Sequence, residues 1–330
     1  MAKSTIVELA RAAGVSPTTV SHAFSGRRYV DPETRAKILA LADEMGYRAN
    51  PRARRLRTGG AGSIALASSM PFAVAAGPAR LGFLMEIAAA AAVTALSRNL
   101  ALCLVPPLEP DSNLDALEVD GAIIVEPAGE DRLLDFFSAR NVPVVSIGRA
   151  PGRTDIPWVD IQSTATARLL LDHLGETGRR VGLITGEQRR NSYIETEAAY
   201  AAFAAERGFP PAALRLDERG GEGASAAAAE TLLRRNPDIE ALCVPVDAFA
   251  TGVLDAARSL GRSVPQMLRL ATRYDGMRAK LATPQLTAVD LHLDQVADAA
   301  IDMLISAMDG KEPVQHVIAP PQLIVRGSSC

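Results

Sequence analysis

The sequence has 330 residues, of which 48% are hydrophobic and 22% charged, a length and composition that suit a globular protein of two or three domains. This composition excludes a disordered, collagenous or coiled-coil chain. The net charge of −3 conceals an asymmetry, since residues 1–60 carry 11 basic and 5 acidic residues, a charge of +6, and the remainder carries 24 basic and 33 acidic residues, a charge of −9. A basic segment joined to an acidic body is typical of a polyanion-binding module fused to a domain that does not bind polyanions.

The cysteines and the N-terminus indicate a cytoplasmic protein. Cys103, Cys243 and Cys330 are far apart, form no CxxC pair and are odd in number, which fits a reducing compartment. No apolar segment followed by a small-residue cleavage site is found near the N-terminus, so we expect no secretory signal. The longest apolar run, Ile87–Leu96, is too short to span a bilayer.

The N-terminal segment is predicted to form three short helices. Thr5 and Glu8 have the spacing of a capping box, and Ser16 and Asp31 each precede a proline at the first position of a helix. The expected inward-facing positions are Ile6, Leu9, Ala10 and Ala13 in the first helix, Val20, Ala23 and Phe24 in the second, and Ile38, Leu41, Ala42 and Met45 in the third. Only residues 14–15 separate the first two helices, the short connection of a helix-turn-helix. Together with the basic charge, this pattern favours DNA binding over an ordinary three-helix bundle.

A short basic segment follows these helices. Asn50 and Pro51 are predicted to begin a helix of barely two turns that contains four arginines and ends before Gly59. An isolated helix of this length is marginal in water, so we expect it to be a flexible linker when free and to become helical against a phosphate backbone.

From residue 63 to 320 short apolar strands alternate with helices, which predicts two parallel sheets covered on both faces. The expected strands are SIALA, LALCLV, GAIIV, VPVVSI, VGLIT, ALCVPV, LRLAT and LTAV. The expected helices are residues 79–98, 164–176, 195–207, 224–235 and 247–260. The glycine-rich run at 220–223 has no following lysine and is interpreted as a surface loop before a helix.

The body shows no catalytic constellation. It contains no phosphate-binding loop, HExxH motif or nucleophile elbow, and the four histidines of the whole chain are scattered, so we expect no enzyme activity, no metal and no cofactor. Polar side chains instead follow four strands, where doubly wound sheets bind ligands. They are Ser68 and Ser69, Arg149, Asp247, and Tyr274 with Asp275. Each could serve as a helix cap, but together they favour a polar small-molecule ligand.

At this point the sequence resembles the LacI/GalR family of transcriptional repressors along its whole length. The motifs that carry the resemblance are TIVELARAAGVSPTTVSHAFSG, VDPETRAKILALADEMGYRANPRARRLRTG, HLGETGRRVGLITG, VDAFATGVLDAA and PPQLIVRGSS. The resemblance implies a homodimer that binds a near-palindromic operator, with a recognition helix in the major groove and a hinge helix in the minor groove.

Matched residue by residue, the resemblance implies that the DNA contacts are made by a defined set of side chains. Base readers would be Pro17, Thr18 and His22, while Ser16, Thr19, Ser21 and Tyr29 would mostly contact phosphates and Thr5 would also bind the DNA. Leu56 would be the minor-groove wedge, with Asn50 and Ala53 as its neighbours. The alternative for Leu56 is a linker residue that packs on the body.

The resemblance also implies three parts: a DNA-binding domain (1–49), a hinge (50–62) and an effector-binding and dimerisation body (63–330). The body would divide into an N-subdomain, residues 63–161 and 291–319, and a C-subdomain, residues 162–290 and 320–330, with the effector between them. Ligand binding would change the angle between the subdomains and hence operator affinity.

The effector residues implied by this match are Ser69, Met70, Arg149, Trp158, Ser192, Thr196, Asp247, Tyr274 and Asp275. The sequence departs from the family pattern at Thr196, where many members have arginine, and at Gln162 and Ser163, where an Asp-Asn pair is common. Arg149 and the pair at 189–190 are alternatives for an anionic ligand, although the pair is interpreted as a solvated loop. Trp158 is interpreted equally as a sugar-stacking or a core residue.

We therefore expect a cytoplasmic, nucleoid-associated repressor controlled by a sugar or an anionic sugar derivative. No leucine heptads follow the last predicted strand, which predicts a dimer without a tetramerisation helix. The alternatives are a cytoplasmic solute-binding protein and an α/β enzyme with an accessory DNA-binding head.

Overall fold

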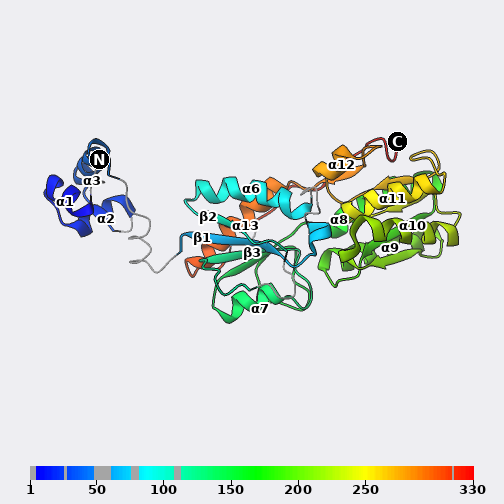
Figure 1. The fold of residues 1–330 in the computed structure, drawn as a ribbon, viewed down its shortest axis with the longest axis horizontal. Helices are drawn as coiled ribbons and strands as arrows, with labels where there is room; N and C mark the ends of the chain where they lie inside the picture. Colours follow the sequence, from blue (N-terminus) through cyan, green and yellow to red (C-terminus); the bar gives the residue numbers. More distant parts are fainter. Residues whose placement is uncertain (1–4, 26–27, 48–60, 76–81, 108–112, 314–315) are drawn as a thin grey trace. The chain divides into compact units, whose positions relative to one another are not determined.

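A computed structural model describes residues 5–25, 28–47, 61–75, 82–107, 113–313 and 316–330 (Figure 1). The chain forms two compact units, residues 1–61, which we call the head, and residues 62–330, which we call the body. Within the described residues, none of the helices has the length and apolar character needed to cross a membrane.

The head contains the three predicted helices, α1 (Ile6–Ala13), α2 (Pro17–Ser25) and α3 (Pro32–Glu44). Thr5 and Glu8 form the expected capping box, with the Thr5 amide donating to the Glu8 carboxylate over 2.7 Å. The Ser16 hydroxyl accepts from the Thr19 amide at 3.1 Å, and the Asp31 carboxylate accepts from the Thr34 amide at 3.0 Å. These local caps satisfy amides that a helix leaves without partners, so each helix begins where the sequence predicts.

Most predicted core positions of the head are confirmed. Leu9, Val20 and Ile38 are fully buried at the centre of the three helices. The prediction that Phe24 faces inward is wrong, because its side chain is 37% exposed and its ring lies against Tyr47 with 5.7 Å between centroids. Three helices this short leave no room for a further large ring at their centre, so the two rings cover one edge of the core instead.

The first sheet of the body is parallel, with strand order β2-β1-β3-β4-β5. Its strands are β1 (Ser63–Ser68), β2 (Ala101–Leu104), β3 (Gly121–Val125), β4 (Val144–Ile147) and β5 (Trp158–Val159). Successive residues of β1 enter opposite cores, Ile64 and Leu66 on one face and Ala65 and Ala67 on the other. Both faces are therefore buried, as continuous apolar strands predict.

Helices cover both faces of this sheet (Figure 1). The helices α6 (Phe83–Ser97) and α13 (Leu293–Met308) pack together on one face, and α7 (Arg132–Ala139) contacts β3 and β4 on the other. A single-turn helix, α5 (Phe72–Ala75), follows β1. Because α13 lies near the C-terminal end of the sequence, one face of the first sheet is covered by a helix that follows the whole second sheet in the chain.

The second sheet is also parallel, with order β7-β6-β8-β9. Its strands are β6 (Val181–Gly186), β7 (Ala213–Leu216), β8 (Ala241–Cys243) and β9 (Arg269–Ala271). Its helices are α8 (Ser163–Leu174), α9 (Asn191–Arg207), α10 (Gly221–Arg235), α11 (Asp247–Ser259) and α12 (Met277–Leu281), with 3₁₀ turns at Glu176–Gly178 and Glu218–Gly220. A small antiparallel pair, β10 (Ala288–Asp290) and β11 (Gln322–Ile324), completes the body. Two doubly wound parallel sheets after a helical head confirm the predicted fold class.

The prediction of a surface loop at 220–223 is wrong. Gly221, with φ +50°, is buried and begins α10, so most of the glycine-rich run belongs to that helix. The helix starts early because α10 packs very closely on α11 at Gly252, where a Cβ atom would lie 2.2 Å from the carbonyl oxygen of Glu222. Residue 252 must be glycine for the two helices to approach this closely.

The connections between the two sheets are tied to one another. The Gln162 amide, immediately before α8, donates to the Ala319 carbonyl at 2.9 Å, and His292 Nε2, immediately before α13, donates to the Pro320 carbonyl at 3.1 Å. Three segments that are distant in sequence therefore meet between the sheets. The exact subdomain boundaries near residues 161, 291 and 320 stay a proposal.

Candidate DNA-binding head and ligand cleft

The head presents polar side chains along α2 and just beyond it. Pro17 and Thr18 are exposed, Thr19 and His22 are half-buried, and Tyr29 is 88% exposed beyond the helix. Ser16 is exposed but also caps the helix, whereas Ser21 is mostly buried. The helix α2 therefore presents a hydroxyl near its start and an imidazole in its last turn, which can donate to and accept from base edges in a major groove. Asn50, Ala53 and Leu56 lie outside the described residues.

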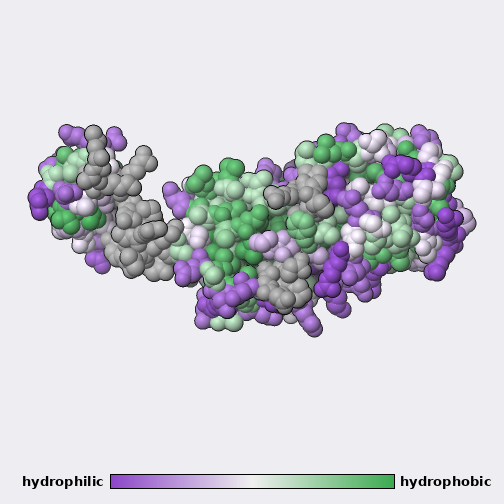
Figure 2. Space-filling model, viewed as in Figure 1, coloured by the Kyte–Doolittle hydropathy of each residue, from purple (hydrophilic) through white to green (hydrophobic). Residues whose placement is uncertain are grey.

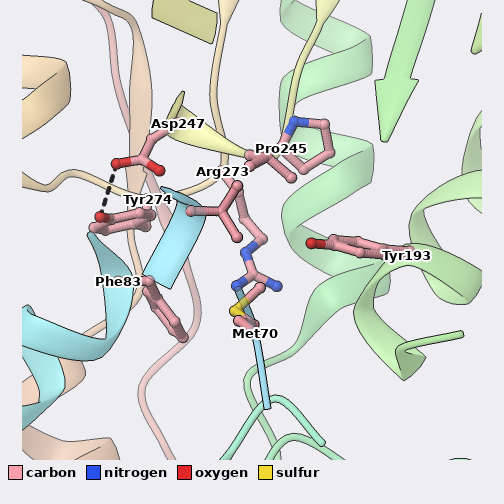
Figure 3. A pocket seen from close by; sticks show the side chains of 9 residues that line it. Met70, Phe83, Tyr193, Pro245, Asp247, Arg273 and Tyr274 are labelled. Carbon is pink, nitrogen blue, oxygen red and sulfur yellow. Dashed lines mark hydrogen bonds between the residues drawn. The ribbon is translucent and has the colours of Figure 1, made fainter. Parts of the chain in front are cut away.

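In the body, the structure brings three of the predicted effector residues to one cavity. Met70, Asp247 and Tyr274 line it together with Phe83 and Arg273 (Figure 3). These residues follow strands β1, β8 and β9, so the cavity lies at the carboxyl ends of strands from both sheets, as the strand-end rule predicts.

Asp247 is the centre of one hydrogen-bonded group in this cleft. Its carboxylate accepts from the Tyr274 hydroxyl at 2.9 Å and from Arg278 Nε at 3.0 Å, and Arg278 also pairs with Glu222. Burial raises the pKa of Asp247, although Arg278 and Tyr274 act in the opposite direction. Burial, with the nearby Asp247 charge, raises the pKa of Tyr274 well above its ordinary value. This group is a rigid wall of the cleft whose polar atoms are largely committed to one another.

Glu126 and Arg190 form a second group that the sequence analysis did not select. Arg190 donates to the Ser69 hydroxyl at 3.1 Å and to the Glu126 carbonyl oxygen, and its Nε lies 3.5 Å from the Glu218 carboxylate. The Glu126 carboxylate accepts from the Ser192 hydroxyl and pairs with Arg273 at 3.3 Å. Ser69 and Ser192, both predicted effector residues, thus lie on opposite sides of this group.

The interpretation of residues 189–190 as a solvated loop is wrong for Arg190. Its side chain is 1% exposed, while Arg189 beside it is exposed. The physical reason is an antiparallel bridge between Ala128 and Arg190, reinforced by the Gly129 amide donating to the Arg189 carbonyl at 2.8 Å. This bridge brings the end of β6 against the loop after β3 and turns the Arg190 side chain into the body.

The remaining predicted residues lie elsewhere. Arg149 lies 5.7 Å from the Trp158 ring and pairs with Glu195 at 3.6 Å, a partly exposed cluster. Asp275 faces away from the cavity lining and pairs with Lys280 and Arg326. Thr196 is buried within α9. The structure therefore places Arg149, Trp158, Thr196 and Asp275 outside the cavity lining.

The residues that sequence reasoning missed also follow strand ends. Glu126 comes directly after β3, and Arg273 comes two residues after β9. The rule that selected Asp247 would have selected both. No pattern of that kind marks Arg190, because only the bridge to Ala128 determines its burial.

Two family models match the chain. A model described as "Bacterial regulatory proteins, lacI family" matches residues 5–50, and one described as "Periplasmic binding protein-like domain" matches residues 171–329.

Among curated relatives, the HTH-type transcriptional regulator CelR of Thermobifida fusca is 27% identical over 336 residues, which are 99% of this chain and 98% of that protein. The HTH-type transcriptional regulator IpsA of Corynebacterium glutamicum is 28% identical over 318 residues, 86% of each chain.

Two solved structures extend the comparison. A transcriptional regulator CelR–cellobiose complex has a TM-score of 0.71 at 25% identity and covers 99% of this chain and 100% of that one. A lac repressor dimer bound to operator and the anti-inducer ONPF has a TM-score of 0.73 at 21% identity, with 99% coverage of both, which establishes likeness of fold. The helix-turn-helix head and the two-sheet body, each with its own family match, show that this chain joins a lacI-family DNA-binding domain to a periplasmic-binding-protein-like domain and is a DNA-binding transcriptional regulator with an effector-binding body.

Proposed function

We propose that this regulator is a sequence-specific repressor whose operator affinity is set by a small molecule bound between the two sheets. The observation that carries the proposal is the meeting of charged residues from both sheets at one buried cleft, in a chain that also has a DNA-binding head. A ligand that contacts both sheets changes their relative orientation, which couples the cleft to the DNA. By reciprocity, operator DNA changes effector affinity by the same factor.

The proposed DNA contacts of the head lie along α2 and just beyond it. Thr18 and His22 supply polar readout of bases, because Pro17 has no backbone donor, and Ser16, Thr19, Ser21 and Tyr29 lie on phosphates. The relative crystallised as a lac repressor dimer on its operator has the same fold, which supports this assignment. Thr5, Asn50, Ala53 and Leu56 complete the proposed DNA-contacting set.

The proposed effector is a sugar or a sugar-derived metabolite. The relative CelR is described as a complex with cellobiose, and the cleft of this chain is lined by a mixture of aromatic and charged side chains that suits a polyhydroxyl compound. Ser69, Met70, Ser192, Asp247 and Tyr274 are the predicted effector residues at or beside the cleft.

We propose further that the protein is a homodimer through one apolar face of the body. Large apolar side chains are exposed on α6 and on nearby elements, and Figure 2 shows apolar residues gathered over α6. The members of this face are Phe72, Val93, Leu96, Leu104, Met277 and Leu281. The Met277 amide donates to Glu86 of α6 at 3.1 Å, so α12 continues the same surface. A twofold interface here would pair two heads for two half-sites of a palindromic operator.

The test combines operator selection with ligand screening on the full chain. Selection from random duplex DNA yields an operator, a reporter gene behind that operator distinguishes repression from activation, and a thermal-shift panel of sugars, sugar acids and nucleosides identifies ligands. We expect repression in the reporter and a ligand that changes operator affinity. Failure to select any sequence would favour a solute-binding protein, and turnover of a bound compound would favour an enzyme.

A further inference from the structure

Glu126 connects the two sheets beside the cavity, where it pairs with the cavity-lining Arg273. It follows β3 of the first sheet, while the side chains that bind it follow strands of the second sheet, namely Ser192, Arg273 and Arg190. Glu126 is 2% exposed and adopts a left-handed backbone conformation with φ 52°, which is costly for a residue other than glycine. A strained, buried carboxylate held by the opposite sheet indicates a role beyond packing.

The cleft has almost no space while this carboxylate is in place. The cavity beside it is about 20 Å³, enough for about one water molecule and far below the several hundred Å³ of a small-molecule pocket. A sugar-sized ligand therefore enters only if side chains leave. Both groups that bind the Glu126 carboxylate, Ser192 and Arg273, follow strands of the second sheet, so these contacts break when the sheets separate.

The cleft also contains buried donors without acceptors among the described residues. They are the Tyr193 hydroxyl, which points into the cavity (Figure 3), and Nε of Arg273. Such donors cost free energy until an acceptor reaches them. A ligand rich in hydroxyl and carboxylate oxygens supplies acceptors, so the vacant donors favour an oxygen-rich compound.

We propose that Glu126 acts as an internal ligand, and that the effector is a hydroxylated carboxylic acid, such as a sugar acid, whose carboxylate replaces that of Glu126 on Ser192 and Arg273. This inference rests on the proposed function, since it identifies the class of effector for the same cleft. It makes Glu126 and Arg273 the residues that select an acid over the matching neutral sugar.

The need of the buried Arg273 for a negative counter-charge explains why an acid is preferred over a neutral sugar. When Glu126 leaves, the buried Arg273 guanidinium loses its carboxylate, while Arg190 keeps its pairing with Glu218. A neutral sugar would leave Arg273 buried without a counter-charge, which is strongly unfavourable. A ligand carboxylate restores the charge and the hydrogen bonds together.

In the first experiment, a mutation removes the Glu126 side chain and a free carboxylate is supplied in solution to take its place. Glu126→Gly suits the left-handed backbone and leaves a hole of the size of propionate. We expect sodium propionate to raise the thermal midpoint of Glu126→Gly by about 3 °C or more over an equal concentration of sodium chloride, and to leave wild type and the control Glu130→Gly, at an exposed glutamate, unchanged. An equal rise with neutral propionamide, or no rise at all, would overturn the proposal.

The second experiment keeps the shape of the side chain and removes its charge, so it serves even where Glu126→Gly does not fold. Calorimetry compares matched pairs, glucose with glucuronate and galactose with galacturonate, on wild type, Glu126→Gln and Glu130→Gln. We expect Glu126→Gln to bind an acid about tenfold more tightly than wild type and to bind the hexoses no better. Equal changes for acids and hexoses, or no change, would contradict the internal-ligand role.

Operator binding separates this inference from the proposed function. If a neutral sugar, and no acid, changes operator affinity, the effector class proposed here is wrong while the repressor function stands. If propionate rescues Glu126→Gly but no operator can be selected, the anion site stands and the repressor function is wrong.

Discussion

Gln162 and His292 adopt the same left-handed backbone conformation, with φ 50° in each, one residue before α8 and α13. Both side chains donate to the segment at 319–320, at 2.9 Å and 3.1 Å. Two of the three segments that connect the sheets therefore have the same arrangement, a left-handed residue that precedes a helix. The third connecting segment, at 319–320, accepts a hydrogen bond from each of them.

Two substitutions at Gln162 separate the contribution of its side-chain hydrogen bond to the free energy of unfolding from the cost of its left-handed backbone. Gln162→Ala loses the hydrogen bond to Ala319 and should lower the free energy of unfolding by about 1 kcal/mol. Gln162→Gly loses the same bond but releases about 1 kcal/mol of left-handed strain, so it should remain close to wild type. Urea denaturation measures the free energy of unfolding of both variants. A Gln162→Gly variant that is less stable than Gln162→Ala would show that the backbone at this position is not strained.

His22 is predicted to read a base. His22→Ala should weaken binding to the selected operator by about 1–3 kcal/mol and leave binding to random DNA nearly unchanged. Tyr29→Phe is the matched control for a phosphate contact, since it should weaken both equally and reduce the salt dependence. Fluorescence anisotropy at two salt concentrations measures these effects, and equal loss on both DNAs for His22→Ala would make it a phosphate contact.

Leu96 is predicted to lie in the dimer interface. Its side chain is 75% exposed, so Leu96→Glu should leave the fold of the body intact while placing two repelling charges at a twofold contact. Sedimentation should then show monomers, with weaker operator binding. Val317→Glu, at a residue that is 98% exposed and outside the proposed face, provides the control. A Leu96→Glu variant that remains dimeric would place the interface elsewhere.

Arg190 is predicted to be the side chain whose truncation costs the body most. Arg190→Met leaves the buried Glu218 without its cation and should destabilise the body by about 3–5 kcal/mol. Replacing both partners, in Arg190→Met with Glu218→Met, should recover most of this loss, because Glu218 is no longer a buried charge without its cation. Arg189→Met, at the exposed neighbour, should have no effect in the same denaturation experiment. A double variant no more stable than the single one would exclude charge pairing as the cause.

His173 predicts a loss of stability in mild acid. Burial lowers its pKa below the ordinary value of 6.5, with a further lowering from Arg269 and an opposing effect from Glu176. The unfolded chain therefore binds the proton more readily, so stability is lost as the pH falls below about 6.5 towards the lowered pKa. The difference between the thermal midpoints at pH 7.5 and pH 5.5 should be smaller in His173→Gln than in wild type. The control is His316→Gln, at an exposed histidine, and an equal effect there would contradict the assignment.

Much of the fold could be predicted because its signals are local. Caps at Thr5, Ser16 and Asp31 determine where the head helices begin, and continuous apolar runs determine the buried strands. Phe24 and the glycines at 220–223 were mispredicted because their environment depends on distant partners, Tyr47 in one case and Gly252 in the other.

The cleft was predicted only in part for the same reason. Strand ends identify Asp247 and Tyr274, and they also mark Glu126, which was overlooked. Arg190 resembles a surface arginine in sequence, and only its bridge to Ala128 shows that it is buried. A resemblance to known regulators indicates where a cleft lies, but the charges that fill it depend on tertiary contacts.

The mutual pairing of Glu126, Arg190 and Arg273 constrains how this regulator can evolve. Each of the three satisfies a polar group of another residue in a site closed to water, so a single exchange leaves a buried charge or donor without compensation. New specificity is therefore accessible mainly through coupled substitutions, and these positions should covary among close homologues. The cleft would then change its preferred compound in steps rather than by gradual drift.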